Sequence, residues 1–163
     1  TSGVLKEKSY TNISTIGLYI NILVKGVQLG DESSIKKLES VLSRLETMPK
    51  WNGLYYWLYN FNNGQIEKSS NSIVSAVDNG HLFLSLASLV GGLDTNQDSR
   101  GSGIVNRANM LIENGRAGWS KLYDNSRGLL FGGWKTDTNQ PLTYHLDRKM
   151  SESRSAVVWS ILN

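Results

Sequence analysis

Two kinds of helical pattern alternate along this chain of 163 residues. Residues 16–24, 78–89 and 151–162 are largely apolar on every side of a helix, which is typical of helices surrounded by other protein. Residues 33–48 and 102–113 are instead amphipathic, with apolar side chains at helical spacing and polar ones opposite. The pattern therefore predicts buried helices that alternate with peripheral ones.

Capping residues and helix breakers indicate where these helices begin and end. Pro49 stops the first amphipathic helix, because proline lacks an amide hydrogen and clashes with the preceding turn. Gly115 is a C-cap for the second. The N-cap candidates, all small polar residues, are Thr11, Asn12 or Ser14 for the first helix and Ser33 or Ser34 for the second.

Two aromatic-rich stretches separate the helices. Residues 51–61 are followed by Asn62-Asn63-Gly64 and then by 65–67, and an Asn-Gly pair between β-prone runs predicts a hairpin. Residues 119–123 and 129–134 flank a polar turn, which predicts a second hairpin.

The order buried helix, amphipathic helix, hairpin occurs twice and leads into a third buried helix. Aligning the buried helices places Thr15, Asp78 and Glu152 at one position, with offsets of 63 and 74 residues. Such a repeat indicates helix pairs arranged around an axis. We therefore predict an all-α fold, a partial (α/α)6 toroid with short aromatic-rich β-hairpins between helix pairs. Since six pairs need roughly twice this length, residues 1–163 are expected to be a single domain and a fragment of a larger toroid.

Composition narrows the classes of function. The net charge of +3 is small and the basic residues are scattered, whereas a nucleic-acid groove needs a clustered basic face. No apolar run reaches the roughly 18 residues of a membrane span. The absence of cysteine excludes disulfides, thiolate metal sites and a cysteine nucleophile. The sequence thus predicts neither a nucleic-acid partner nor a membrane span.

Two acids form a candidate catalytic pair. In a ring of helix pairs the inner helices start at one end, so Asp78 and Glu152 would face a shared cavity. Glycoside hydrolysis uses two carboxylates, one that protonates the departing oxygen and one that activates water or attacks the sugar. We assign Glu152 as the acid and Asp78 as the base. The side chains predicted to bind the substrate are Trp51, Asn52, Tyr55, Trp57, Asn79, Trp134, Tyr144 and Arg154.

Other interpretations stay open at this point. Asp78 can simply cap its helix, and aromatic residues in hairpins usually pack the core. Asp78 and His81 could meet on one helix face, but a metal site would need more ligands than His145 adds. Residues 94–98 lack the glycine and glutamate of a calcium loop, and no Gly-x-Ser-x-Gly motif of a serine hydrolase is present. We predict no metal and no cofactor.

Four stretches, in order, resemble a known family. They are residues 15–19, 49–56, 77–82 and 151–156, and the most specific parts are Val77-Asp78-Asn79-Gly80 and Ser151-Glu152-Ser153-Arg154. These stretches resemble glucoamylase-like bacterial proteins that include endo-β-1,2-glucanases and parts of cyclic β-1,2-glucan synthases. Ser2-Gly3-Val4-Leu5 also resembles a related bacterial family with the same helical toroid.

The resemblance implies an (α/α)6 toroid, a β-glucan or similar polysaccharide as substrate, and a secreted or periplasmic location. It also implies that catalytic carboxylates occupy the positions of Asp78 and Glu152, in agreement with the repeat. The expected function is that of a glycoside hydrolase. The alternative is a non-catalytic carbohydrate-binding or cell-envelope scaffold protein on the same fold. The remainder of the toroid is expected to lie outside this chain.

Overall fold

Helices account for more than half of the residues that the computed structural model describes, which are 9–93, 99–147 and 154–162. In chain order they are α1 (Ile13–Gln28), α2 (Glu32–Thr47), α3 (Ala76–Gly92), α4 (Ser99–Asn114), α5 (Arg116–Leu122) and α6 (Arg154–Leu162). Each of the helices predicted from the apolar pattern is present. The described helices mostly extend beyond the apolar patterns, because small and polar residues at their ends are helical as well.

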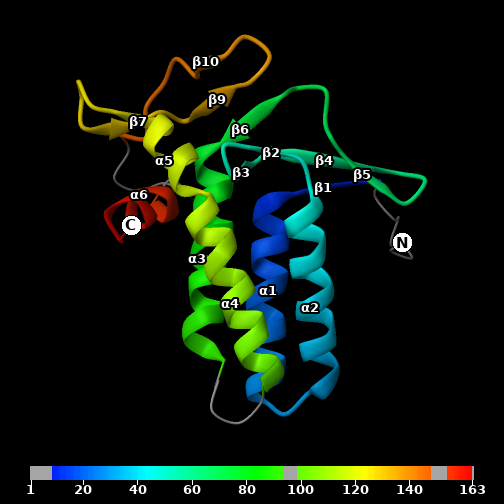
Figure 1. Ribbon diagram of the computed structural model, residues 1–163. Helices are drawn as coiled ribbons and strands as arrows, with labels where there is room; N and C mark the ends of the chain where they lie inside the picture. The colour runs from blue at the N-terminus through cyan, green and yellow to red at the C-terminus, as the bar shows by residue number, and fades with distance from the viewer. Residues whose placement is uncertain (1–8, 94–98, 148–153, 163) are drawn as a thin grey trace, which may run out of the picture.

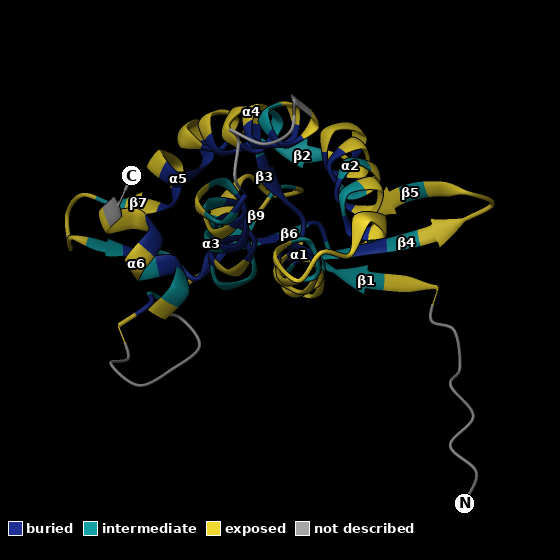
Figure 2. Cartoon of the chain, turned by 90° about the horizontal axis from the view of Figure 1, so that it is seen from below, coloured by how far each residue is buried: buried dark blue, intermediate teal, exposed yellow. Residues whose placement is uncertain are grey.

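The helices form two layers. Figure 2 shows α1, α3 and α6 in one row and α2, α4 and α5 in a second row beside it. The amphipathic α2 buries Leu38, Leu42 and Leu45 completely and exposes most of its polar side. This arrangement confirms the predicted alternation of inner and peripheral helices. That the layers close into a ring of six pairs stays a prediction.

The inner helices α1 and α3 run in the same direction. Each of three hydrogen bonds joins residues that are 64 positions apart, namely Ser14 with Asp78, Asn21 with Ser85 and Gln28 with Gly92. A constant offset at steps of seven residues is possible only for parallel helices in matched register. Gly17 permits the close approach, since a Cβ there would lie 3.0 Å from the Cα of Leu82.

The inner helix α6 also packs closely on α3. A Cβ on Gly80 would lie 2.5 Å from the Cα of Ala156. One turn farther along, the rings of Phe83 and Trp159 meet with their centroids 5.4 Å apart. In Figure 2, α1 and α3 are seen almost end-on, whereas α6 is inclined to them.

Small antiparallel sheets lie at the end of the molecule where α1 and α3 begin (Figure 1). The strands are β1 (Tyr10–Asn12), β2 (Lys50–Trp51), β3 (Leu54–Tyr55), β4 (Leu58–Asn62), β5 (Gln65–Lys68), β6 (Ile73–Ser75), β7 (Tyr123–Asp124), β8 (Leu129–Leu130), β9 (Gly133–Lys135) and β10 (Gln140–Pro141). Their orders are β1-β4-β5, β10-β9-β6, β2-β3 and β7-β8. Since β1 leads directly into α1 and β6 into α3, each three-stranded sheet anchors the start of one inner helix.

The first predicted hairpin is confirmed. Strands β4 and β5 pair with Asn62 opposite Gln65, which leaves Asn63 and Gly64 as a two-residue turn. Both turn residues have positive φ, 49° and 78°, as a type I′ turn requires. The fold is thus predominantly helical with small sheets, and the all-α class describes only its helical part.

The second predicted hairpin is partly wrong. Residues 119–123 were expected to be a strand, but α5 covers Arg116–Leu122, and the hairpin is the shorter pair β7 and β8. Tertiary packing favours the helix. It places Gly118 against Leu54, whose Cγ would lie 2.4 Å from an added Cβ, and brings the ring of Trp119 to 5.7 Å from that of Phe83.

One N-cap prediction is confirmed and one is wrong. Asn12 caps α1, and its side chain accepts a hydrogen bond from the Thr15 amide. Asp31, not Ser33 or Ser34, caps α2. The hydroxyl of Ser34 is buried and donates to the Asp31 carboxylate at 2.7 Å. This hydrogen bond is the main cause of a lowered pKa of Asp31.

None of the helices in the described part of the chain is long and apolar enough to cross a membrane.

The contact between Gly80 and α6 gives the first testable prediction. Gly80→Ala would force α6 away from α3 and is expected to lower the free energy of unfolding by about 1–3 kcal/mol. Gly91→Ala, on the same helix, meets no atom within 4 Å. It is expected to raise stability by up to about 1 kcal/mol, because alanine favours helix. Urea unfolding of both variants is the measurement, and equal effects would contradict the close-packing argument.

Candidate active site

The candidate site lies where α1 and α3 begin, next to the sheets (Figure 1). The two helices are capped in the same way. The side chain of Asn12 accepts from the amide of Thr15, and that of Ser75 accepts from the amide of Asp78. Each cap satisfies one of the amide groups that a helix start leaves without a partner. The equivalence of Thr15 and Asp78 that the repeat predicts is therefore confirmed by the capping pattern.

Asp78 is the third residue of α3 and is half-buried. Its Oδ1 accepts a hydrogen bond from the hydroxyl of Ser14 on α1 at 2.8 Å. The same hydroxyl lies 3.2 Å from Oδ1 of Asn12, and it has only one hydrogen to donate. The shorter contact to a carboxylate is the stronger one. Ser14 thus ties the orientation of the Asp78 carboxylate to the start of the neighbouring helix.

Two of the predicted sugar-stacking residues pack against each other. The rings of Trp51 on β2 and Trp134 on β9 are stacked with centroids 5.1 Å apart. Trp134 stands opposite Val74 on β6, the strand that leads into α3. Its Nε1 donates to Asn139 at 3.2 Å, and Lys121 approaches Trp51 with Nζ 6.0 Å from the ring centroid. The pair forms a half-buried aromatic surface above the start of α3.

Three further predicted residues are exposed. Tyr144 covers Gly132, where its ring leaves no room for a Cβ, and the carbonyl of Gly132 accepts from the amide of Ala76 at the start of α3. Trp57 is held beside β6 by the hydrogen bond from its amide to Ile73. Asn52 is a turn residue with a φ of 48°. Tyr144 and Trp57 therefore expose aromatic rings to solvent, and their contacts are to the start of α3 and to β6, the strand that leads into it.

The prediction that Tyr55 and Asn79 bind substrate is wrong, because both side chains are fully buried. Asn79 Oδ1 accepts from the Tyr55 amide, and its Nδ2 donates to the Tyr55 carbonyl, both at 2.8 Å. The Tyr55 hydroxyl donates to the carbonyl of Leu45, and burial raises the pKa of Tyr55 well above its ordinary value. Neither side chain has surface with which to contact a sugar.

The second predicted carboxylate, Glu152, lies outside the described residues. Arg154, the first described residue of α6, is exposed. Ala156, two residues farther along, packs on Gly80 near the start of α3. The approach of Glu152 to Asp78 therefore stays a prediction, and so does the role of Arg154.

The sequence analysis did not select Ser14, the hydrogen-bond partner of Asp78. A signal was present, since Ser14 precedes Thr15, the residue that the 63-residue repeat aligns with Asp78. The repeat shows which positions are equivalent, however, and not which ones touch. The contact partner of Asp78 is one residue away from its equivalent, because neighbouring helices in a row face each other with different sides.

His145 takes part in a different interaction. Its Nε2 lies 2.9 Å from Oδ2 of Asp124, and its ring packs on Phe131. The pKa of Asp124 is lowered to about 2, mainly by the hydrogen bond from Ser126 and then by His145. Across the described residues, no group of three or more histidine and carboxylate side chains could hold a metal ion.

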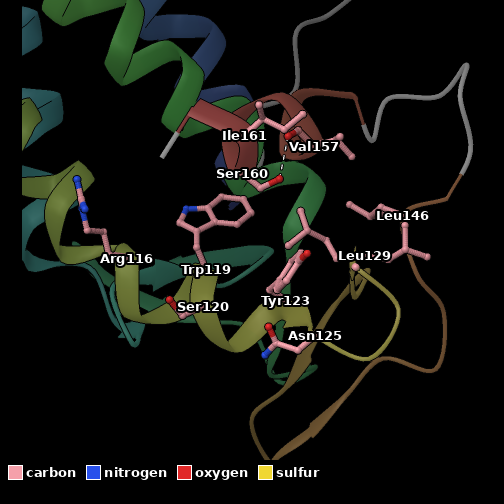
Figure 3. Close-up of a pocket in the computed structure, with 12 residues that line it drawn as sticks. Arg116, Trp119, Ser120, Tyr123, Asn125, Leu129, Leu146, Val157, Ser160 and Ile161 are labelled. Carbon is pink, nitrogen blue, oxygen red and sulfur yellow. Dashed lines mark hydrogen bonds between the residues drawn. The ribbon is translucent and has the colours of Figure 1, made fainter.

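A pocket of about 660 Å³ lies between α5, the hairpin β7–β8 and α6 (Figure 3). Trp119, Tyr123, Leu129 and Ile161 contribute to its wall. Among the described residues that line it there is no predicted site residue and no carboxylate. Asp78 is thus not part of the described wall of this pocket.

Solved structures share this fold. The β-1,2-glucanase from Parabacteroides distasonis matches with a TM-score of 0.71 at 17% identity over 94% of this chain. The endo-β-1,2-glucanase from Talaromyces funiculosus, in complex with sophorose, matches with a TM-score of 0.73 at 10% identity over 93%. A glucoamylase-like protein from Bacteroides fragilis matches with a TM-score of 0.68 at 15% identity over 83%.

The chain spans only 22%, 37% and 34% of the lengths of these three proteins. At such low identity the likeness establishes the fold, which is that of part of these glycoside hydrolases. No protein-family model and no curated protein matches the sequence.

The structural role of Asn79 is testable. Asn79→Ala would leave the Tyr55 amide and carbonyl buried without partners and is expected to cost about 2–4 kcal/mol of unfolding free energy. Asn21→Ala, which removes a part-buried hydrogen bond from an exposed residue of α1 to α3, should cost less than about 1 kcal/mol. Chemical denaturation measures both. Wild-type stability in the Asn79 variant would contradict the structural assignment.

Proposed function

We propose that this chain provides part of a glycoside hydrolase site that acts on a β-linked glucan, with Asp78 as the base and Glu152 as the acid. The observation that supports the proposal best is the half-buried Asp78 at the start of an inner helix, oriented by Ser14, in a fold shared with β-1,2-glucanases. The substrate class is inferred from those proteins and from the exposed aromatic rings nearby.

The proposed mechanism needs two carboxyl groups on opposite sides of the scissile bond. Glu152 donates a proton to the departing glycosidic oxygen. Asp78 accepts a proton from the attacking water, and the Ser14 hydrogen bond holds its carboxylate in one orientation while this happens. Tyr144, Trp57 and the Trp51–Trp134 pair offer flat apolar surfaces against which sugar rings can stack. We include a secreted or periplasmic location in the proposal, because we expect the substrate to lie on the outer side of a cell.

A second candidate function is saccharide binding without catalysis. It is favoured by the position of Asp78 in the first turn of α3, where a carboxylate stabilises a helix through the helix dipole. On this view the Ser14–Asp78 hydrogen bond joins two helices and has no chemical role. The two candidates differ in whether turnover, and not only binding, depends on the carboxylates.

Substitution of the two acids separates these candidates. In the full-length protein, Asp78→Asn and Glu152→Gln are each expected to reduce the release of reducing ends from a β-glucan by about 10²–10⁴-fold. Circular dichroism and oligosaccharide binding should remain close to wild type. Binding without turnover in the wild-type protein would favour the scaffold function, and full activity in either variant would refute the assignment of that acid.

The positioning role of Ser14 has its own test. Ser14→Ala is expected to lower kcat about tenfold or more with little change in KM, because the carboxylate loses its orientation but the sugar contacts remain. Ser14→Thr keeps the hydroxyl and should restore most of the rate. Asn21→Ala, which removes another hydrogen bond between α1 and α3, is the matched control. Equal kcat losses in the alanine variants of Ser14 and Asn21 would indicate a general packing effect.

A further inference from the structure

One aromatic ring of the candidate site is placed by an irregular segment and not by a helix or a strand. Tyr144 lies in residues 142–146, which follow strand β10, and its side chain is 56% exposed. Its ring lies on Gly132, where it occupies the space that a Cβ would need. The position of this ring therefore depends on where the segment 142–146 itself lies.

Backbone hydrogen bonds pair this segment with residues 130–133. They join Tyr144 to Gly132, Leu142 to Gly133 and Leu146 to Leu130 at 2.8–2.9 Å. The carbonyl of Gly132 in turn accepts a hydrogen bond from the amide of Ala76, the first residue of α3, at 3.0 Å. Asp78 lies two residues farther along α3. The segment is thus connected to the helix start that carries the proposed base.

The side chain of His145 holds the segment from its other face. His145 forms an antiparallel bridge with Phe131, and the two rings pack with their centroids 4.7 Å apart. Its Nε2 lies 2.9 Å from Oδ2 of Asp124, the last residue of β7. The exposed fractions of these two side chains are only 11% and 16%. Neighbouring side chains of an extended segment point to opposite faces, so this pair lies on the face that Tyr144 does not use.

Asp124 is also held in place by a second residue. Its Oδ1 accepts hydrogen bonds from the amide of Ser126 at 2.9 Å and from the hydroxyl of Ser126 at 2.6 Å. The hydroxyl is the main cause of the lowered pKa of Asp124, about 2, and His145 is the next. The carboxylate is therefore ionised at neutral pH. It can accept a hydrogen bond from the imidazole whether the ring is neutral, with its hydrogen on Nε2, or protonated.

Stability alone does not account for a mostly buried pair of this kind. Both groups lose most of their hydration, and an apolar pair of similar size often stabilises a fold equally well. A hydrogen bond differs from an apolar contact because it requires one placement of donor and acceptor. The neighbouring feature that needs a defined placement is the exposed ring of Tyr144, which contacts a sugar in the proposed function.

We propose that His145, held by Asp124, is a positioning residue for Tyr144. It fixes the segment 142–146 so that the ring of Tyr144 lies over Gly132, next to the start of α3, where the ring stacks on a sugar of the bound glucan. His145 itself does not touch the substrate. This role rests on the proposed function, because it concerns one sugar contact of the same site.

Michaelis parameters separate this positioning role from a catalytic one. In the full-length protein, His145→Ala is expected to raise KM for a β-glucan oligosaccharide about three- to tenfold and to change kcat by less than about twofold, because stacking weakens while the carboxylates stay in place. His145→Gln keeps a side-chain N–H donor and should return KM to within about twofold of the wild-type value. An unchanged KM in the alanine variant, or a loss of kcat alone, would overturn the proposal.

A double-mutant cycle shows whether the effect of His145 passes through Tyr144. Tyr144→Ala is expected to raise KM at least as much as His145→Ala does. The double variant should then have the same KM as Tyr144→Ala, because two residues that act through one contact are not additive. If the two increases in KM multiply instead, His145 acts independently of Tyr144 and the proposal is wrong.

Ser126→Ala is the matched control for a general loosening of the hairpin. It removes the 2.6 Å hydrogen bond to Oδ1 of Asp124, while His145 and the amide of Ser126 still hold the carboxylate. The midpoint of thermal unfolding is expected to fall, as it does in His145→Ala, but KM should stay at the wild-type value. An equal rise of KM in both variants would show that loosening, and not the placement of Tyr144, causes the effect.

Failure of the proposed function gives a different result from failure of this inference. If the wild-type protein binds a β-glucan without cleaving it, the same changes are expected in the dissociation constant, measured by titration calorimetry. A wild-type protein that neither binds nor cleaves a β-glucan would refute the proposed function, and the role of His145 with it. Normal affinity of His145→Ala beside an active or binding wild-type protein would refute the role of His145 alone.

Discussion

The close contact between inner helices is the constraint on which the rest of the structure depends. Gly17 and Gly80 have no side chain, so the backbone of α3 approaches α1 and that of α6 approaches α3. At such short distances the helices can pack only in defined registers. The starts of α1 and α3 consequently coincide, and this brings Ser14 within hydrogen-bond distance of Asp78 across 64 residues of sequence.

A buried polar clamp joins the hairpins to this helical layer. Asn79 satisfies both backbone groups of Tyr55 from within the first two turns of α3. Leaving those groups unpaired would cost far more than a typical hydrogen bond contributes, because they are completely desolvated. The clamp fixes the segment that carries Trp51, which stacks on Trp134. The two neighbouring residues therefore have different roles. Asn79 stabilises the packing of the hairpin segment on α3, whereas Asp78 lies at the candidate site.

Much of the helical scaffold could be predicted from local patterns. Particular residues show where local patterns no longer predict the structure. The apolar periodicity identified α1, α2, α3 and α4, and the Asn63-Gly64 turn identified one hairpin. The segment around Trp119 was misjudged, because its aromatic and β-prone composition resembles a strand while its packing on Phe83 and Leu54 favours a helix. Tyr55 and Asn79 were misjudged for the same reason. Their burial depends on partners that local composition does not reveal.

The sequence by itself determined the alternation of inner and peripheral helices, the 63-residue offset and the candidate role of Asp78. These features are local or periodic, and periodicity is carried by the chain without reference to its partners. Only the tertiary structure decided that Ser14 orients Asp78 and that Asn79 is buried. Burial and hydrogen bonding depend on which surfaces meet across more than 60 residues of chain. The pattern of a single helix does not indicate which helix packs against it.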